Sequence, residues 1–254
     1  MNPPRRTLPA LALATGLLVV LSIVAYTARD RLYRAVAGLD RMPPEAMRDA
    51  IDLTARQGLL VLVAITGLVS IVAWRRGRDS FVLLACLGAG TISAYLTSEL
   101  VKLVVREERP CRTLDPVTVL ACPAPGDWSW PSNHSTIAAA LATACILVVR
   151  RSWYVVAPIA ALIALSRVGA GVHYVHDVTA GLAVGIVVTC AVGLLGNTVV
   201  RPLLAPRPHP VRGPRAAATP TEVLETPPPT PTCGPLPERK GPHAAKRLPT
   251  GSLG

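Results

Sequence analysis

The sequence predicts an all-α, polytopic membrane protein: a six-transmembrane-helix bundle followed by a disordered Pro-rich C-terminal tail. Of its 254 residues, 51% are hydrophobic and only 16% are charged, against roughly a quarter in soluble domains. The hydrophobic residues gather in runs long enough to span a bilayer. The basic residues, which give a net charge of +11, stand in clusters between these runs. That pattern is typical of membrane topology signals, and we expect no nucleic-acid partner.

Changes in composition divide the chain into four segments. They are a first transmembrane helix (residues 1–28), an interfacial amphipathic segment (29–56), a core with five transmembrane helices (57–200) and a disordered cytoplasmic tail (201–254). The first apolar run follows Arg5 and Arg6, which is also the arrangement of a signal peptide. It is longer than the apolar part of such a peptide, so we favour a helix that is retained.

Residues 29–56 contain six basic and five acidic residues and the pair Pro43-Pro44. This composition predicts two short amphipathic pieces that lie on the membrane surface. The tail differs from the rest of the chain, because it holds 14 of the 25 prolines and almost no apolar periodicity. Such a segment buries too little surface to offset the entropy lost on ordering.

Five further apolar runs follow the interfacial segment, at residues 57–74, 80–105, 132–149, 153–165 and 174–200. Basic clusters at residues 75–78 and 150–151 close two of these runs, and basic clusters favour the cytoplasmic side. We therefore expect a multi-pass protein of the cell membrane with both termini in the cytoplasm. The loop of residues 106–131 and the turn near residues 167–173 then lie together on the extracytoplasmic side.

Two of the six cysteines, Cys111 and Cys122, share that outer loop. Disulfides persist in extracytoplasmic compartments, and a bridge over this spacing would stabilise the fold by about 3 kcal/mol. A disulfide between them is one expectation, and two free thiols are the alternative. The other four cysteines lie in apolar runs or in the tail, and they form no zinc-binding pattern.

The stretch from residue 165 to residue 177 carries the residue types of a phosphoryl-transfer site. Arg167 offers a planar fork of donors that suits phosphate oxygens, and His173 offers a nitrogen that acts as a nucleophile or base near neutral pH. Asp177 follows His173 by four residues, so a helix that begins near His173 would place both on one face. A carboxylate on one ring nitrogen would fix the tautomer of the imidazole.

A second pair of basic residues, Lys102 and Arg109, stands at the end of the run of residues 80–105. Their spacing of seven residues is two helical turns, so both should point the same way, and Pro110 should stop the helix. Basic residues that merely extend to the membrane surface are the alternative.

The stretch Pro131-Ser132-Asn133-His134 precedes another apolar run and predicts a helix N-terminus. Free backbone N–H groups make such a terminus an anion site, where His134 could protonate a departing oxygen. The alternative is an ordinary capped helix start.

Together the three stretches read Lys-x6-Arg-Pro, Pro-Ser-Asn-His and Ser-Arg-x5-His-x3-Asp. In this order, on six spans, they resemble the signature of the type 2 phosphatidic acid phosphatase superfamily, which also contains the soluble vanadium haloperoxidases. The resemblance covers roughly residues 55–200. One position departs from it, because the family usually has Gly where this chain has Asn133, whose side chain would narrow the phosphate pocket.

The resemblance implies a role for each motif residue. His173 would attack phosphorus and form a phosphohistidine, Asp177 would orient His173, and His134 would protonate the leaving group. His176 would be a bystander. The resemblance implies no metal and no other cofactor. The residues that it assigns to phosphate binding are Lys102, Arg109, Ser132, Asn133 and Arg167.

The function implied is hydrolysis of a lipid phosphate or prenyl diphosphate at the outer membrane face, with membrane lipids as neighbours. Two alternatives stay open. One is a lipid phosphotransferase that uses the same phosphohistidine, and the other is a non-catalytic membrane protein with a relic site. The sequence does not specify which lipid is the substrate or what the oligomeric state is.

Overall fold

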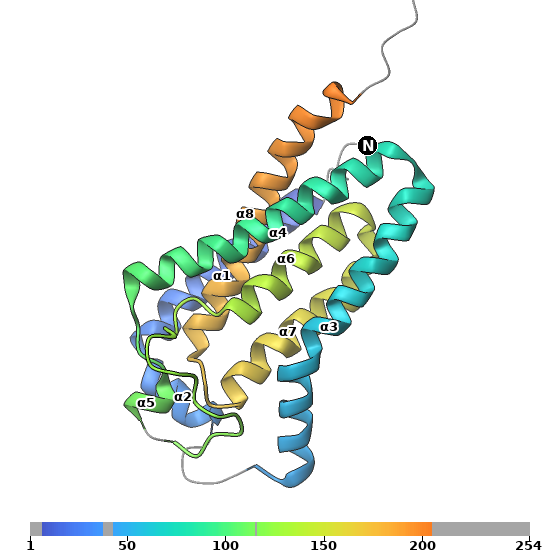
Figure 1. The fold of residues 1–254 in the computed structure, drawn as a ribbon. Coiled ribbons are helices and arrows are strands. Elements are labelled where there is room, and N and C mark those ends of the chain that lie inside the picture. Colours follow the sequence, from blue (N-terminus) through green and yellow to red (C-terminus); the bar gives the residue numbers. More distant parts are fainter. Residues whose placement is uncertain (1–6, 38–42, 115, 205–254) are drawn as a thin grey trace, which may run out of the picture. The chain divides into compact units, whose positions relative to one another are not determined.

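A computed structural model describes residues 7–37, 43–114 and 116–204, and within these residues every regular element is helical (Figure 1). The elements are α1 (Thr7–Thr27), α2 (Arg29–Ala37), α3 (Glu45–Arg76), α4 (Arg78–Val105), α5 (Pro110–Thr113), α6 (Asn133–Val148), a 3₁₀ turn (Arg150–Ser152), α7 (Trp153–Gly169) and α8 (Val175–Leu203). The all-α fold class predicted from the sequence is confirmed.

Five helical segments of the described chain are long and apolar enough to cross a membrane. They are α1, α3, α4 with the short α5, the 3₁₀ turn with α7, and α8. The remaining apolar helix, α6, has 16 residues and spans about 24 Å at 1.5 Å per residue, less than a bilayer core of about 30 Å. The six apolar helices coincide with the six predicted runs, and the protein is a multi-pass membrane protein.

The long helix α8 lies at the centre of the bundle and packs against α4, α6 and α1. Glycines let the backbones approach closely, as is common between membrane helices. A Cβ built on Gly185 would lie 2.3 Å from the carbonyl oxygen of Thr136, and one on Gly181 would lie 2.6 Å from that of Ser132. The glycines therefore fix how α6 and α8 sit against each other.

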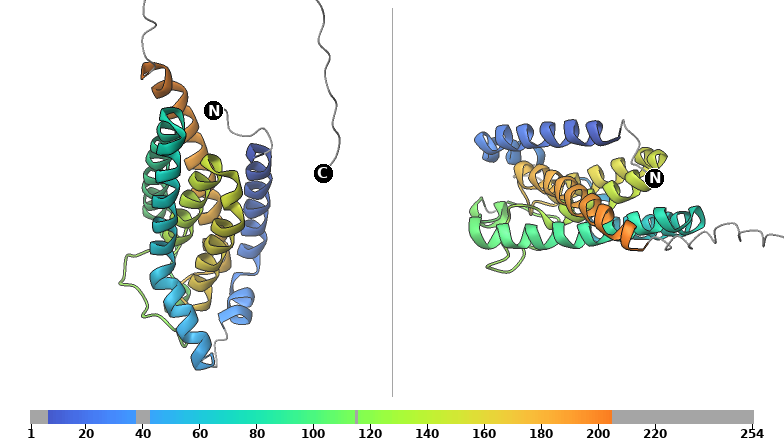
Figure 2. Two further views of the ribbon diagram at one scale, coloured as in Figure 1. Left: turned by 90° about the vertical axis from the view of Figure 1, so that its right-hand side faces the viewer. Right: turned by 90° about the horizontal axis from the view of Figure 1, so that it is seen from above.

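Helix α1 runs along one side of the bundle (Figure 2) and packs mainly on α8. Its other side chains point outward: Leu13 is 67% exposed and Leu17 is 63% exposed. An apolar face of this size needs lipid or another apolar partner to cover it. The interior of the bundle is formed by large side chains such as Leu62, Leu87 and Ile163, which are fully buried.

The interfacial segment differs from the expectation of two short surface pieces. The first piece is α2, but the second, from Glu45, is continuous with the following apolar run in the 32-residue helix α3. At 1.5 Å per residue α3 is about 48 Å long, so part of it extends beyond the bilayer core. Helix α2 also packs against the turn before α8, because the Tyr33 hydroxyl donates a hydrogen bond of 2.8 Å to the Gly171 carbonyl.

The loop between α4 and α6 folds over the end of the bundle where α2 also lies (Figure 1). Cys111 and Cys122 form a disulfide in this loop, with a Cα–Cα distance of 5.9 Å. The Arg112 guanidinium donates a hydrogen bond to the Pro123 carbonyl and links the same two stretches. Residues 111–112 and 122–123 of the loop are therefore tied together, close in sequence to Arg109.

The predicted disordered tail lies almost wholly outside the described residues, as does the stretch before Thr7. Only its first residues are described, and Arg201 belongs to the last turn of α8. Its guanidinium pairs with Asp79 of α4 at 2.5 Å, so the start of the predicted tail continues the bundle.

The close contact of α6 and α8 predicts that Gly185 tolerates no larger residue. Gly185→Val would force its Cβ into the Thr136 carbonyl, and overpacking of this kind costs about 1–3 kcal/mol. Thermal unfolding in detergent should show a lower midpoint for this variant. Gly67→Val is the matched control, because nothing lies within 4 Å of the Cβ position there. Equal midpoints for the two variants would contradict this account of the packing.

Candidate active site

All three sequence motifs meet at one end of the bundle, around a small cavity of about 100 Å³. Lys102 comes from the end of α4, Arg167 from the last turn of α7, and His173 from the turn before α8. The cavity is lined by Lys102, Arg109, Pro123, Asp127, Asn133, His134, Arg167 and His173. Six of these eight residues were candidates from the sequence, and Pro123 and Asp127 are additions from the loop.

The side chains of His173 and Asp177 are in contact, as their spacing predicted. Nδ1 of His173 lies 3.2 Å from Oδ2 of Asp177, and both side chains are buried. The geometry differs from the expected shared helix face, because α8 begins only at Val175. His173 precedes the helix, and Asp177 reaches back to it from the first turn.

The carboxylate of Asp177 also caps the helix that carries it. Its Oδ2 accepts the backbone N–H of Tyr174 at 2.8 Å, and it accepts a hydrogen bond from the Ser129 hydroxyl. The backbone carbonyl of Asp177 accepts the N–H of Ser132 at 3.1 Å. This residue therefore joins the start of α8 to the loop and to the start of α6.

The contact between Arg109 and His173 defines the tautomer of the imidazole. Nη1 of Arg109 lies 2.9 Å from Nε2 of His173, and a guanidinium can only donate. Nε2 must therefore be the acceptor, so in the neutral ring the proton is on Nδ1, the atom that faces Asp177. Burial lowers the pKa of His173 well below its usual value, and the positive charges of Arg109 and Arg167 lower it further. The ring is neutral at physiological pH, with its lone pair on Nε2.

Two cations of the cavity, Lys102 and Arg109, share a carboxylate from the loop. Oδ1 of Asp127 lies 2.8 Å from Nη2 of Arg109 and 3.6 Å from Nζ of Lys102. Burial raises the pKa of Asp127, but the hydrogen bond and charge of Arg109 and the charge of Lys102 outweigh it and lower the pKa. Lys102 also lies 3.5 Å from Glu99, one turn earlier on α4.

Lys102 and Arg109 converge, although not for the reason expected from the sequence. Helix α4 ends at Val105, and Arg106 takes a left-handed conformation with φ of 51°. The two residues therefore do not share a helix face across two turns. Pro110 does not stop α4 either, because it is the first residue of α5. The loop that follows α4 turns Arg109 back towards Lys102.

The remaining predicted residues lie at or beside the cavity. His134 and Arg167 line it, and Nε of Arg167 is buried without a hydrogen-bond partner among the described residues. Asn133 also lines it, but its side-chain amide donates to Glu99 and accepts from the Ser98 hydroxyl, both on α4.

Ser132, the N-cap residue of α6, is fully buried and accepts a hydrogen bond of 3.3 Å from Ser135. It precedes the cavity-lining residue Asn133, and its hydroxyl is directed into its own helix.

Three neighbours of the site had no signal in the sequence. Asp127 and Ser129 are loop residues with no fixed spacing from any motif, and only the folded loop brings them to Arg109 and Asp177. His176, expected to be a bystander, lies with its Nε2 3.2 Å from Oδ1 of Asp177.

Solved structures to which this chain shows a similarity include a transmembrane PAP2-type phosphatidylglycerolphosphate phosphatase from Bacillus subtilis. It is 21% identical, with a TM-score of 0.49, over 74% of this chain and 96% of that one. Another is Aquifex aeolicus LpxE, 19% identical with a TM-score of 0.45, over 67% of this chain and 94% of that one.

Similar sequences include the decaprenylphosphoryl-5-phosphoribose phosphatase of Mycobacterium tuberculosis. It is 32% identical over 139 residues, which are 54% of this chain and 71% of that protein. An undecaprenyl-diphosphatase of Sulfolobus acidocaldarius is 35% identical over 95 residues, which are 37% of this chain and 46% of that protein. The sequence pattern of the PAP2 superfamily matches residues 83–200, the stretch that contains all three motifs. This chain belongs to the PAP2 superfamily and is a membrane phosphatase of that family.

Proposed function

We propose that this protein hydrolyses a lipid phosphate or prenyl diphosphate through a phosphohistidine on His173. The contact of Arg109 with Nε2 of His173 carries the proposal. It holds the lone pair of a neutral imidazole at a cavity lined by the cations Lys102, Arg109 and Arg167. Attack on a phosphoryl group requires a nucleophile with a free lone pair and cations that compensate the charge of the phosphoryl oxygens.

In the first step, the oxygens of a phosphoryl group take over the donors of Arg109 and free Nε2 for attack on phosphorus. A bond forms between Nε2 and phosphorus as the bond to the leaving oxygen breaks. His134, which lines the same cavity, takes up a proton when the negative charge of the bound phosphoryl group offsets that of the nearby cations, and it gives this proton to the leaving oxygen. Asp177 holds the proton on Nδ1 and stabilises the positive ring as the new bond forms.

In the second step, His134 takes a proton from water, which attacks phosphorus from the side that the leaving group vacated. The bond from Nε2 to phosphorus breaks, and inorganic phosphate leaves. Throughout, Lys102, Arg109 and Arg167 compensate the charge on the phosphoryl oxygens, which is the main requirement of phosphoryl transfer. The unpartnered Nε of Arg167 is a donor ready for such an oxygen. These residues supply the charge compensation, and we propose no catalytic metal.

The size of the cavity and the relatives support a prenyl-linked substrate. A volume of about 100 Å³ accommodates a phosphate group and little more, so the rest of the substrate lies outside it. Two relatives carry polyprenyl compounds in their names, decaprenylphosphoryl-5-phosphoribose and undecaprenyl diphosphate. We propose that this chain acts on the phosphate of a polyprenyl-linked lipid at the extracytoplasmic face.

The mechanism predicts that the two histidines fail differently when they are replaced. His173→Ala removes the atom that bonds to phosphorus, so no phosphoenzyme should form with any substrate. His134→Ala removes only the proton donor, whose contribution is typically about 10²- to 10⁴-fold in rate. It should therefore lose that much turnover with an alkyl phosphate and recover with an aryl phosphate, whose leaving group needs little protonation. Rapid-quench trapping of phosphoenzyme and steady-state rates measure both effects.

Vanadate should inhibit the native protein, because it mimics five-coordinate phosphorus, and chelators should leave activity unchanged. Near-native turnover of His173→Ala, or a strict need for a divalent cation, would disprove the mechanism.

The ion pairs of Asp127 predict that this carboxylate competes with phosphate. Asp127→Asn leaves Lys102 and Arg109 without their anionic partner, so inorganic phosphate should bind more tightly, by about two- to fivefold for a half-exposed ion pair. Titration calorimetry on purified protein measures the change. Asp52→Asn, which removes an exposed carboxylate paired with Arg56 on α3, should change nothing. Weaker phosphate binding by Asp127→Asn would mean instead that Asp127 is needed to hold Arg109 in place.

The proposed orientation predicts the labelling of two introduced cysteines. Val117→Cys lies in the loop of residues 106–131 and is 47% exposed, whereas Arg151→Cys lies at the other end of the bundle. In a background without unpaired cysteines, an impermeant maleimide added to intact cells should label the first and not the second. The reverse pattern would place the site on the cytoplasmic side.

A further inference from the structure

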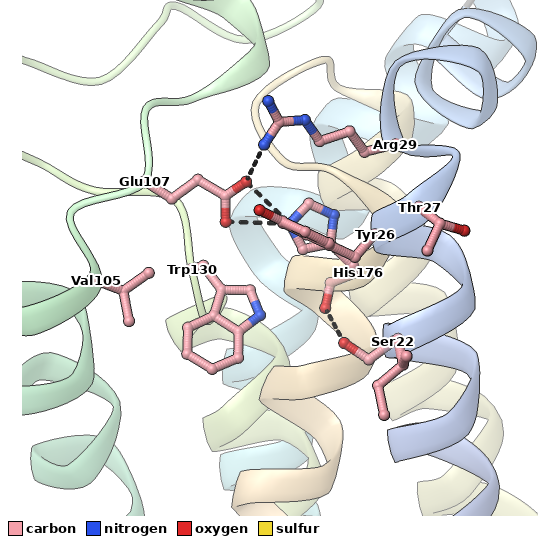
Figure 3. Close-up of a pocket in the computed structure, with 9 residues that line it drawn as sticks. Ser22, Tyr26, Thr27, Arg29, Val105, Glu107, Trp130 and His176 are labelled. Atoms are coloured by element: carbon pink, nitrogen blue, oxygen red, sulfur yellow. Dashed lines mark hydrogen bonds and ion pairs between the residues drawn. The ribbon is translucent and has the colours of Figure 1, made fainter.

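A second cavity, of about 550 Å³, is lined in part by His176, the residue before Asp177 (Figure 3). It is bounded by the end of α1, the start of α2, the end of α4 and the loop, and shares no lining residue with the cavity at His173. Its polar groups form a chain: Arg29 lies 3.3 Å from Glu107, and both carboxylate oxygens of Glu107 lie 3.1 Å from Nε2 of His176. Figure 3 shows Glu107 between the other two side chains.

The ring of His176 is held in one orientation by the groups around it. It is 1% exposed, stacks on Tyr174 with ring centres 5.3 Å apart and meets the ring of Tyr26 edge-on at 5.1 Å. Its backbone carbonyl accepts a hydrogen bond from Ser22 on α1. A side chain fixed in this way directs its nitrogen at a defined target.

The target of Nε2 is a pair of carboxylates. It lies 3.1 Å from Glu107 and 3.2 Å from Oδ1 of Asp177, and carboxylates only accept when ionised. Nε2 must therefore carry a hydrogen, which it donates to Glu107, and the same N–H group lies beside Oδ1 of Asp177. Glu107 thus holds His176 in the tautomer that can donate to Asp177.

The two oxygens of Asp177 have unequal surroundings. Oδ2 receives the Tyr174 N–H, the Ser129 hydroxyl and Nδ1 of His173. Oδ1 is buried and, among the described residues, has no well-aligned hydrogen bond, with Nε2 of His176 as its neighbour at 3.2 Å. A carboxylate held only at one oxygen can rotate about its bond to Cβ, whereas one held at both cannot.

We propose that His176 and Glu107 are positioning residues, and that the reaction uses a chain from Glu107 through His176 and Asp177 to His173. The inference rests on the proposed function. His176 holds Oδ1 so that Oδ2 stays on Nδ1 of His173, and Glu107 holds His176. The result is an imidazole whose Nε2 lone pair remains aimed at phosphorus.

The same three residues, Glu107, His176 and Asp177, each place one ligand atom within 4.8 Å of the others, as a metal site would also require. We favour the relay, because one nitrogen lies at hydrogen-bonding distance from both carboxylates and three donors already engage Oδ2 of Asp177. The metal site is an outcome that the experiment distinguishes.

The test compares variants of His176 that do or do not keep a donor near the position of Nε2. His176→Leu removes the donor at similar size and should lower kcat about 10- to 100-fold, as loss of a partner that orients a functional histidine typically does. KM should stay within about twofold, because the cavity of His173 is not altered. His176→Gln, whose amide places an N–H near the same point, should recover most of the lost kcat.

Glu107→Gln keeps the shape and removes the charge, so it should lower kcat in the same direction. Glu108→Gln is its matched control, because Glu108 is half exposed and pairs with Arg112 on the surface. Thermal midpoints in detergent show whether each variant is folded. If His176→Leu does not fold, the comparison of kcat between Glu107→Gln and Glu108→Gln still tests the relay.

Activity of His173→Ala is measured in parallel to separate this inference from the proposed function. An inactive His173→Ala with native kcat in His176→Leu and Glu107→Gln overturns the relay alone. An active His173→Ala overturns the phosphohistidine mechanism of the proposed function. Equal losses of kcat in His176→Leu and His176→Gln also overturn the relay. Stimulation of the native protein by Zn²⁺ or Mn²⁺ that is absent in His176→Leu overturns it too, because that result would identify a metal site.

Discussion

The buried carboxylate of Asp177 is the constraint on which the rest of the site depends. Burial of an ionised carboxylate costs several kcal/mol unless hydrogen bonds and opposite charges compensate it. Here the partners come from separate parts of the chain: Tyr174 at the helix start, Ser129 in the loop, and the rings of His173 and His176. Each of these segments supplies part of the compensation, so burial of the carboxylate favours folding of the loop and the turn together.

The second constraint is the concentration of positive charge beside a neutral imidazole. Lys102, Arg109 and Arg167 line one cavity, and Asp127 is the anion that compensates two of them. Their charges oppose protonation of His173, which favours the form with a free lone pair. The cations that would hold a phosphoryl group therefore also keep the proposed nucleophile, His173, unprotonated.

The sequence predicted the apolar helices and the stretches whose residues converge on the cavity, because both depend on local patterns. Apolar runs indicate membrane helices wherever they occur, and the three motifs indicate which ends of those helices meet. The loop of residues 106–131 could not be predicted in the same way. Its contacts, such as that of Asp127 with Arg109, depend on an irregular backbone path, and no repeating sequence pattern predicts such a path. The position of His176 also depended on a partner, Glu107, that no spacing rule relates to it.

The close packing of α6 on α8 connects the membrane part of the fold to the chemistry. Gly181 and Gly185 let the α6 backbone approach α8, and the Ser132 N–H bonds to the Asp177 carbonyl at the end of the same contact. His134 follows Ser132 on α6, and His173 is held by Asp177 on α8. The register of two membrane helices therefore sets the distance between the two histidines. A residue far from the cavity, such as Gly185, acts on the site because it fixes that register.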